Sequence, residues 1–408
     1  MRFTLIGLLS LASAFASCRP RDFNSIDADV SESSSTKREA VFMFYLDNQT
    51  GDHIDGYVNR HFSKLESIEL RNSAYIVAAF GVEKDINIYT LENRNWKKMN
   101  TLKNASFSDA ASLSALLESG FALKANKYIL TLSDHGFADQ GLMYVAKPSN
   151  GKNVLSNEEV RDSIANAKER YKKNLDILYF DACLMSSIES LFQYTVCKEN
   201  ACSPVADFIV ASENTTVHPG GLDLGGAITK VVGRLGRGGP TTREIGLDLV
   251  ESSKGNRQAD FTMIDMTQLN KAQIDLGISA ITSGATRCLD LLTKKRAQLF
   301  ADRIGAETIV DGHRGDLIGI LNIVSDFCPD QSSEIASILK KLKNEIIIAT
   351  EVDDPNRGKI QRGISIRVSP PAIIKRQVPN YPKNNFVLKS NWMVLLSAIG
   401  KTIDRGNM

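Results

Sequence analysis

The sequence has little of what marks several large classes of protein. Its net charge is only +2, from 49 Lys and Arg against 47 Asp and Glu, whereas nucleic-acid-binding domains usually carry a marked basic excess. No internal repeat is visible, and after the first eighteen residues no apolar run approaches the roughly 18–20 residues that span a membrane. A content of 43% hydrophobic and 24% charged residues excludes wholesale disorder, collagen and a coiled coil. What remains is a globular protein without a nucleic-acid partner.

Cysteine is also scarce, with six residues in 408, which is too low a density for a disulfide scaffold. Without Cys18 five remain, so at least one thiol stays unpaired within the chain. Cys197 and Cys202 are close enough to close a small loop, and a zinc site there lacks a second pair of ligands. For Cys288 and Cys328 the sequence leaves two alternatives, buried thiols or a structural pair.

The first residues have the pattern of an export signal. Residues 1–17 contain Arg2, an apolar run over 3–15 and a small-x-small site at Ala14-Phe15-Ala16, and the apolar run is too short for a membrane helix. Cys18 follows directly, as in a bacterial lipobox, so lipid attachment at Cys18 and simple secretion are both open. Residues 18–40 are polar and Ser-rich and predict a flexible tether. Any membrane contact would run through such an anchor.

From residue 41 onward, short apolar runs alternate with helical patterns. Runs this continuous are typical of strands buried on both faces of a sheet; they cover Val41–Leu46, Tyr75–Phe80, Ile86–Thr90, Tyr128–Leu132, Leu175–Phe180 and Phe208–Ala211. Helices are expected over 108–123, over 156–173 after a Ser156/Glu159 capping box, and over 184–196. This alternation predicts an α/β fold with a mostly parallel central sheet and helices on both faces.

Beyond residue 240 the pattern is more helical. Helices are expected over 242–253, 268–280, 285–304, 333–352 and 392–403, with strands at 261–265 and 364–368. We therefore expect a core over 41–240 and a helical and β extension over 241–408 that packs on it.

Two strand ends carry residues with chemistry. The strand ending at Leu132 leads into Ser-Asp-His135-Gly136, and the strand ending at Phe180 leads into Asp-Ala-Cys183. Ligands of open α/β sheets bind at the carboxyl ends of the strands, so an imidazole and a thiol are expected at one sheet edge. A helix start lowers a thiol pKa, and an imidazole can act as its base. The pattern predicts a cysteine nucleophile with a basic partner.

More ordinary interpretations exist for each residue alone. A His-Gly at a strand end is usually a turn, and a Cys before a helix is usually a small buried side chain. Their occurrence at equivalent strand ends, 48 residues apart, favours catalysis. The other histidines follow no apolar strand: His53, His61, His218 and His313.

The two blocks resemble a known family. YILTLSDHG (128–136) and LDILYFDACLMSSIES (175–190) are similar to the clostripain-like cysteine peptidases, relatives of caspases, legumains and gingipains. Weaker similarities extend over roughly residues 41 to 400, and the His-to-Cys spacing also matches caspases. The resemblance implies a caspase-like fold and hydrolysis of peptide bonds by a Cys-His dyad, with no cofactor required for the chemistry.

The resemblance also implies roles for individual residues. Cys183 would be the nucleophile, His135 its partner, and the backbone N–H groups of Cys183 and Gly136 the oxyanion hole. Asp181 would select Arg, and sometimes Lys, before the cleaved bond; its alternative role is to cap the following helix. Glu213 is the next candidate for selectivity.

The function expected is that of an exported cysteine endopeptidase, secreted, periplasmic or on the cell surface, that acts on peptides or proteins after basic residues. The alternative is a catalytically silent surface lipoprotein that binds a partner and retains the caspase-like fold. A monomer is expected, either uncut or self-cleaved into two chains in the turn-rich loop 139–153, where Lys152 is the preferred site. Some relatives use calcium, but the acidic candidates Glu351, Asp353 and Asp354 have no EF-hand spacing, so no metal site is predicted.

Overall fold

The computed structural model describes residues 36–70, 72–148, 151–198, 201–214, 224–235, 239–252, 260–311, 313–352, 362–369, 373–374 and 378–407. The predicted export signal, Cys18 and His218 lie outside these residues. Residues 37–408 belong to one compact unit, which is the part described below.

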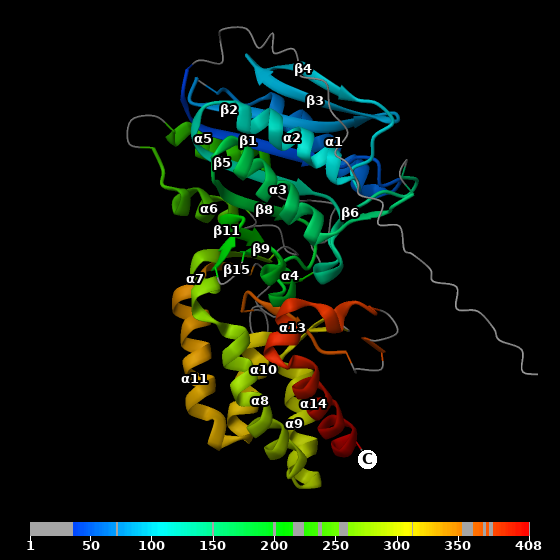
Figure 1. The fold of residues 1–408 in the computed structure, drawn as a ribbon, viewed down its shortest axis with the longest axis vertical. Helices are drawn as coiled ribbons and strands as arrows, with labels where there is room; N and C mark the ends of the chain where they lie inside the picture. The colour runs from blue at the N-terminus through cyan, green and yellow to red at the C-terminus, as the bar shows by residue number, and fades with distance from the viewer. Residues whose placement is uncertain are drawn as a thin grey trace, which may run out of the picture. The chain divides into compact units, whose positions relative to one another are not determined.

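Among the described residues, nine strands form one central sheet, in the order β15-β12-β11-β8-β5-β1-β2-β3-β4 (Figure 1). Its five central strands are parallel: β1 (Arg38–Leu46), β2 (Ala74–Val82), β5 (Ala125–Ser133), β8 (Leu175–Asp181) and β11 (Ala206–Ala211). Antiparallel pairing adds two strands at each edge: β3 (Asp85–Glu92) and β4 (Asn95–Leu102), and β12 (Asp260–Asp265) and β15 (Ile347–Val352). The six strands expected before residue 240 are all present.

Helices cover both faces of the sheet, as predicted. On β1, Val41 and Met43 belong to one buried cluster with helices α2 (Ala110–Ala122) and α3 (Asn157–Tyr171). Phe42 and Phe44 belong to a second cluster with α1 (His53–Glu66), α5 (Leu224–Arg234) and α6 (Thr242–Glu251). Every β1 residue from Ala40 to Leu46 is fully buried, which explains why the strand is apolar on both faces. The Ser156/Glu159 capping box of α3 is formed.

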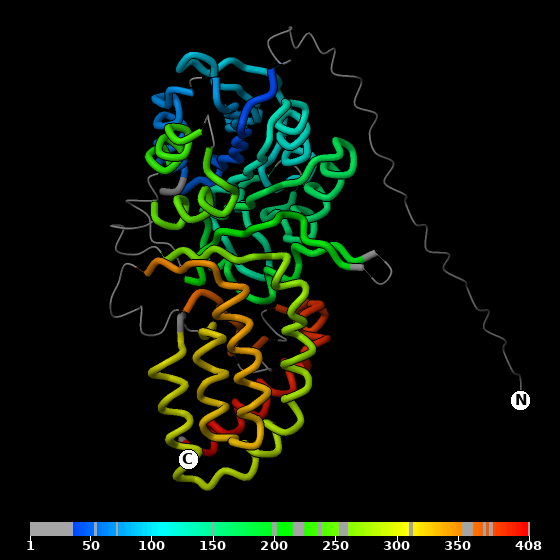
Figure 2. Tube along the Cα trace, turned by 90° about the vertical axis from the view of Figure 1, so that its left-hand side faces the viewer, coloured from blue at the N-terminus to red at the C-terminus, as the bar shows by residue number. Residues whose placement is uncertain are grey.

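The C-terminal region is more helical. Figure 2 shows several of its helices running side by side; they are α8 (Ile274–Asp290), α9 (Lys294–Glu307), α10 (Leu317–Phe327), α11 (Ser332–Lys341) and α14 (Trp392–Asn407), with the short α7 (Met266–Ala272) and α13 (Asn385–Ser390). A small sheet accompanies them, formed by β13 (Ile309–Asp311), β14 (Arg314–Asp316) and β16 (Ser365–Arg367). Strands β12 and β15 also come from beyond residue 240 and join the central sheet. Residues on both sides of position 240 therefore build the core.

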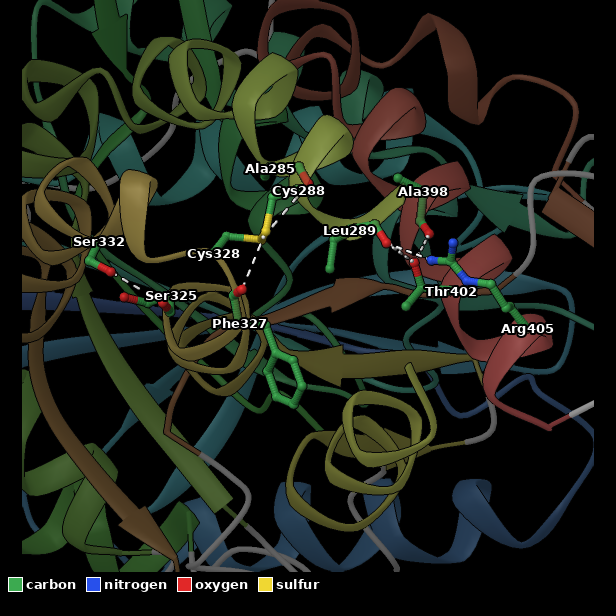
Figure 3. The surroundings of a disulfide bond; sticks show 10 residues. All are labelled: Ala285, Cys288, Leu289, Ser325, Phe327, Cys328, Ser332, Ala398, Thr402 and Arg405. Carbon is green, nitrogen blue, oxygen red and sulfur yellow. Dashed lines mark hydrogen bonds between the residues drawn. A yellow bond between two sulfur atoms is a disulfide. The ribbon is translucent and has the colours of Figure 1, made fainter. Parts of the chain in front are cut away.

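Two disulfides are formed. Cys288 on α8 pairs with Cys328 at the end of α10 (Figure 3), which decides between the two alternatives for these cysteines. Cys197 pairs with Cys202 and links β9 (Thr195–Lys198) to β10 (Ala201–Pro204). Within the part of the chain that the structure describes, Cys183 is the one cysteine outside a disulfide.

The predicted helix over 184–196 is wrong in most of its length. Helix α4 covers only Ile188–Gln193, Ser187 caps it, and β9 follows. The predicted helix over 333–352 is also wrong at its end, because the segment from Ile347 to Val352 pairs with β12 as β15. Cys183 therefore lies on a loop between β8 and α4.

Candidate active site

His135 and Cys183 lie at the same edge of the sheet. Strands β5 and β8 are parallel neighbours in which Ser133 is paired with Asp181. His135 comes two residues after Ser133, and Cys183 comes two residues after Asp181. Gly136 packs against the backbone of Cys183, because a Cβ at position 136 would collide with the Cys183 carbonyl oxygen and lie 3.0 Å from its nitrogen. Only glycine allows this approach. The close contact keeps the His135 and Cys183 loops together.

Hydrogen bonds hold the loop that carries Cys183. The Leu184 N–H donates to the Asn214 carbonyl at 2.9 Å, and the Ser186 N–H donates to the Ser212 carbonyl at 2.7 Å. Leu184 has a φ of +63°, which is sterically costly for a residue with a side chain. Backbone strain of this kind is common at functional sites. Here it lies directly after Cys183.

The sequence predicted that Cys183 would lie at the start of a helix, but it does not. Helix α4 begins at Ile188, and the influence of a helix terminus is limited to its first turn. The groups that can activate Cys183 must therefore come from the neighbouring loop of His135.

The His135 side chain is held by three neighbours. Its Nε2 lies 2.9 Å from Oδ2 of Asp52. The ring stacks on Phe137, with centroids 6.1 Å apart, and meets the edge of Tyr144 at 6.0 Å. Its carbonyl accepts a hydrogen bond from Met143 N at 3.1 Å. The imidazole remains 28% exposed, so it is fixed in place but reachable.

Asp181 is enclosed under this edge. Its carboxylate accepts hydrogen bonds from Tyr57 OH at 3.1 and 3.0 Å and from Ser133 Oγ at 2.6 Å. His61 Nε2 lies 3.4 Å away, and the Asp181 side chain has no exposed surface. The alternative of a helix cap is wrong, since Ser187 caps α4. Asp181 therefore lies inside the protein, surrounded by hydrogen-bond donors, at the edge that carries Cys183.

Glu213 is buried at the end of β11. It accepts a hydrogen bond from Gly363 N at 3.0 Å. Burial, followed by the nearby carboxylates of Asp316 and Asp260, raises its pKa well above the usual range for a glutamate. It therefore holds its proton to a higher pH than an ordinary glutamate and supplies less negative charge.

A pair of buried carboxyl groups lies beside the His135 loop. Asp47 follows β1 and Asp134 directly precedes His135; burial raises the pKa of Asp47 to about 8 and that of Asp134 well above its usual range. Asp47 Oδ2 and Asp134 Oδ1 each lack a hydrogen-bond donor among the described groups. After burial, the charge of Asp47 is the next largest cause of the raised pKa of Asp134, so the two carboxyl groups do not titrate independently. The pair joins the chain after β1 to the chain that bears the histidine.

The remaining predicted residues lie elsewhere. Lys152 is 39% exposed, its Nζ forms an ion pair with Glu159 of the α3 capping box, and its carbonyl accepts from Ser108 Oγ. Glu351 is on β15, while Asp353 and Asp354 lie outside the described residues. No group of three or more His, Cys, Asp and Glu side chains within the described ranges is arranged to hold a metal ion.

Asp52 was not predicted from the sequence. It follows no apolar strand directly, and nothing in its local pattern distinguishes it from a polar loop residue before a helix. One sequence signal did exist: Asp52 lies in the loop after the first strand of a parallel sheet, and such loops lie at the same edge as His135.

A mixed sheet covered by helices, with a thiol and an imidazole on adjacent parallel strand ends, is the architecture of a caspase-like cysteine peptidase. The sequence profile of the clostripain family matches residues 52–280, which is more than half of the chain. The protein belongs to the clostripain family and is a cysteine-type peptidase.

Solved structures agree on the fold. The chain is similar to the secreted C11 cysteine protease "iotapain" of Bacteroides thetaiotaomicron, with 14% identity and a TM-score of 0.60 over 87% of this chain and 99% of that one. The chain is also similar to an inactive zymogen C11 protease from Parabacteroides distasonis, with 13% identity and a TM-score of 0.59 over 87% of this chain and 99% of that one. No curated protein matches the sequence. At this identity the likeness concerns the fold, and it confirms the caspase-like prediction.

Family membership establishes the broad chemistry. Substrates of the family are peptides or proteins, and a thiol nucleophile needs no cofactor for peptide-bond hydrolysis. No helix in the described parts of the chain is long and apolar enough to cross a membrane.

Proposed function

We propose that the protein is an exported endopeptidase that cuts after basic residues with a dyad of Cys183 and His135. The observation that carries the proposal is the pairing of β5 with β8, with Gly136 packed on the Cys183 backbone. It supports joint action of the Cys183 thiol, which lies outside any disulfide, and the partly exposed His135 imidazole.

In this mechanism the Cys183 thiol passes its proton to His135, and the thiolate attacks the carbonyl carbon of the substrate. The backbone N–H groups of Cys183 and Gly136 stabilise the oxyanion, a contribution of about 2.7–4 kcal/mol per donor in comparable sites. His135 then protonates the leaving amine. Water, deprotonated by the same imidazole, releases the acyl group and restores the thiol.

Selectivity for basic residues is supported by two carboxyl groups at this edge. Asp52 is partly exposed beside His135, and Asp181 lies enclosed two residues before Cys183. Enclosed carboxylates act on a nearby cation through a medium of low effective dielectric. The positive charge of a substrate Arg or Lys side chain would interact favourably with these two carboxylates.

Replacement of Asp181 by Asn should lower the preference for Arg over Leu before the cut by about 10- to 100-fold, the equivalent of ~1.4–2.8 kcal/mol of lost charge interaction. The measurement is the ratio of kcat/KM for matched Arg and Leu fluorogenic peptides, because a ratio cancels any loss of folded enzyme. Glu213→Gln is the matched control and should leave the ratio unchanged. The reverse result, with the preference lost in Glu213→Gln and kept in Asp181→Asn, would assign selectivity to Glu213.

The same peptides test the proposed function as a whole. Hydrolysis of an Arg peptide that a thiol alkylator stops is expected from the mature chain. A folded chain that binds the peptide without cutting it would favour the silent surface lipoprotein.

We further propose that the enzyme cuts itself after Lys152. The loop joins the His135 and Cys183 strands, and a similar chain was solved as an inactive zymogen. Because Lys152 pairs with Glu159 and its carbonyl accepts from Ser108, this stretch must leave α3 before it can be cut.

Mass spectrometry of the purified wild type should show two fragments that meet after Lys152, whereas Cys183→Ala protein should stay intact. Lys152→Ala should slow or prevent the cut, and Lys147→Ala, on the same loop but followed by Pro, is the matched control that should not. An intact wild-type chain with full activity would show that the enzyme works uncut.

Export is supported by the two disulfides, since such bonds persist in oxidising compartments, and by the similarity to iotapain, a secreted protease. We propose a monomer that is either secreted or held at the cell surface by a lipid on Cys18. Metabolic labelling with a fatty acid, lost in Cys18→Ala, would distinguish the two.

A further inference from the structure

Asp52 is placed to act on His135 with a defined orientation. One carboxylate oxygen, Oδ2, lies 2.9 Å from His135 Nε2, while the other, Oδ1, lies 2.9 Å from Thr50 Oγ1, whose single proton is shared between Asp52 and Asp55. The backbone N–H of Asp52 also contacts the same hydroxyl at 3.3 Å. The carboxylate is therefore fixed on one side and directed at the imidazole on the other.

The loop that carries Asp52 is itself held in place. Asp55, in the first turn of α1, accepts hydrogen bonds from Thr50 N at 2.9 Å and from Gly51 N at 3.0 Å, and its Oδ1 lies 2.7 Å from the shared Thr50 hydroxyl. Gly51 has a φ of +81° and lies against Ala146, so a larger residue would strain this turn. Such a network preorganises Asp52 at little cost in side-chain entropy at the moment of reaction.

We propose that Asp52 is a positioning residue for His135, a third member that orients the imidazole and stabilises its protonated form. The inference rests on the proposed dyad of Cys183 and His135. With Nε2 held by the carboxylate, Nδ1 is the ring nitrogen left to exchange a proton with the thiol and the leaving amine.

The charge of Asp52 has a direct chemical consequence. When Cys183 gives up its proton, His135 becomes an imidazolium, and a carboxylate 2.9 Å away favours that charged form. Both side chains are partly exposed, at 28% for His135 and 38% for Asp52, so solvent weakens the effect. Other ionisable groups lie in this neighbourhood: the Tyr144 ring meets the imidazole, and the pKa of Asp47 is raised by burial and then by the carboxylates of Asp55 and Asp52.

The test compares Asp52→Asn and Asp52→Glu with the wild type in kcat, KM and the pH dependence of kcat/KM. Asp52→Asn keeps the shape and removes the charge. It should lower kcat about 10- to 100-fold with KM within about twofold, and should move the alkaline fall of kcat/KM to lower pH, because the carboxylate that faces the imidazolium is gone. Asp52→Glu should recover part of kcat.

Two further variants separate orientation from stability. Thr50→Val removes the hydroxyl that holds Oδ1 and should give a smaller loss of kcat in the same direction. Asp162→Asn, at a 59% exposed side chain paired with Arg161 on α3, is the matched control and should behave as the wild type.

The outcomes distinguish this inference from the function on which it rests. Wild-type kcat and an unchanged pH profile in Asp52→Asn, together with an inactive His135→Ala, would overturn the role of Asp52 and leave the dyad standing. A fall in kcat with a lowered Tm, an unchanged pH profile and no recovery in Asp52→Glu would identify a purely structural role at the start of α1. Full activity in His135→Ala would end the dyad itself.

Discussion

Cys183→Ala is expected to abolish peptide hydrolysis, with a loss on the order of 10⁶ in kcat, the scale seen when a covalent nucleophile is removed from a protease. The reason is that Cys183 is the one described cysteine outside a disulfide, on a loop beside an imidazole. The substitution removes one sulfur atom from a partly exposed loop, so the free energy of unfolding should change by less than about 1 kcal/mol. Measurement of kcat/KM and Tm on the same preparation checks both expectations.

The paired cysteines offer a matched control. Cys197 and Cys202 close the β9–β10 hairpin, whose strands are separate from the central sheet. The double variant Cys197→Ala/Cys202→Ala should therefore retain activity. Activity in Cys183→Ala comparable to that of the parent protein would end the assignment of the nucleophile.

His135→Ala should lower kcat by about 10²–10⁴, the usual contribution of a general acid–base group. The thiolate loses its proton acceptor and the leaving amine loses its proton donor, while substrate binding is largely kept, so the effect should appear in kcat more than in KM. Steady-state kinetics with an Arg peptide measures this division.

The other histidines serve as controls for this result. His313 lies on the β13–β14 connection, with Nδ1 2.9 Å from Ser369 Oγ, and His218 lies outside the described residues. His313→Ala and His218→Ala should both remain active. An inactive His218→Ala beside an active His135→Ala would move the general base to a different part of the chain.

The strands of the core were predictable because burial on both faces leaves a nearly continuous apolar run. Val41–Leu46 is such a run, and in the structure all of its residues are fully buried. The same logic failed for β4, whose Asn95–Leu102 segment is an edge strand with few buried residues. Its pairing with β3 depends on a neighbour and leaves little pattern in the local sequence.

The helix after Cys183 was overestimated for a related reason. The segment 184–196 has apolar residues at helical spacing, but Ser186 bonds to Ser212 and Gly363 from distant parts of the chain. These contacts keep the first residues out of a helix, and Ser187 then caps a short α4. Local propensity is weaker than such tertiary contacts.

His135 and Cys183 were predictable as a pair because both follow parallel strands, but their supporting groups were not. Asp139, just beyond His135, forms buried ion pairs with Arg314 and Arg367, and Glu189 on α4 accepts from the Tyr381 hydroxyl at 2.7 Å. These partners are separated from Asp139 and Glu189 by between 175 and 228 residues along the chain. Contacts at such separations exist only in the folded state.

The most direct test of the central claim is to map where an irreversible peptidyl inhibitor with Arg before its reactive group attaches to the mature enzyme. Peptide mass spectrometry should find one adduct, on the peptide that contains Cys183, formed in proportion to the loss of activity and much more slowly in His135→Ala. Loss of activity with Cys183 unmodified, or with the adduct on another residue, would contradict the account.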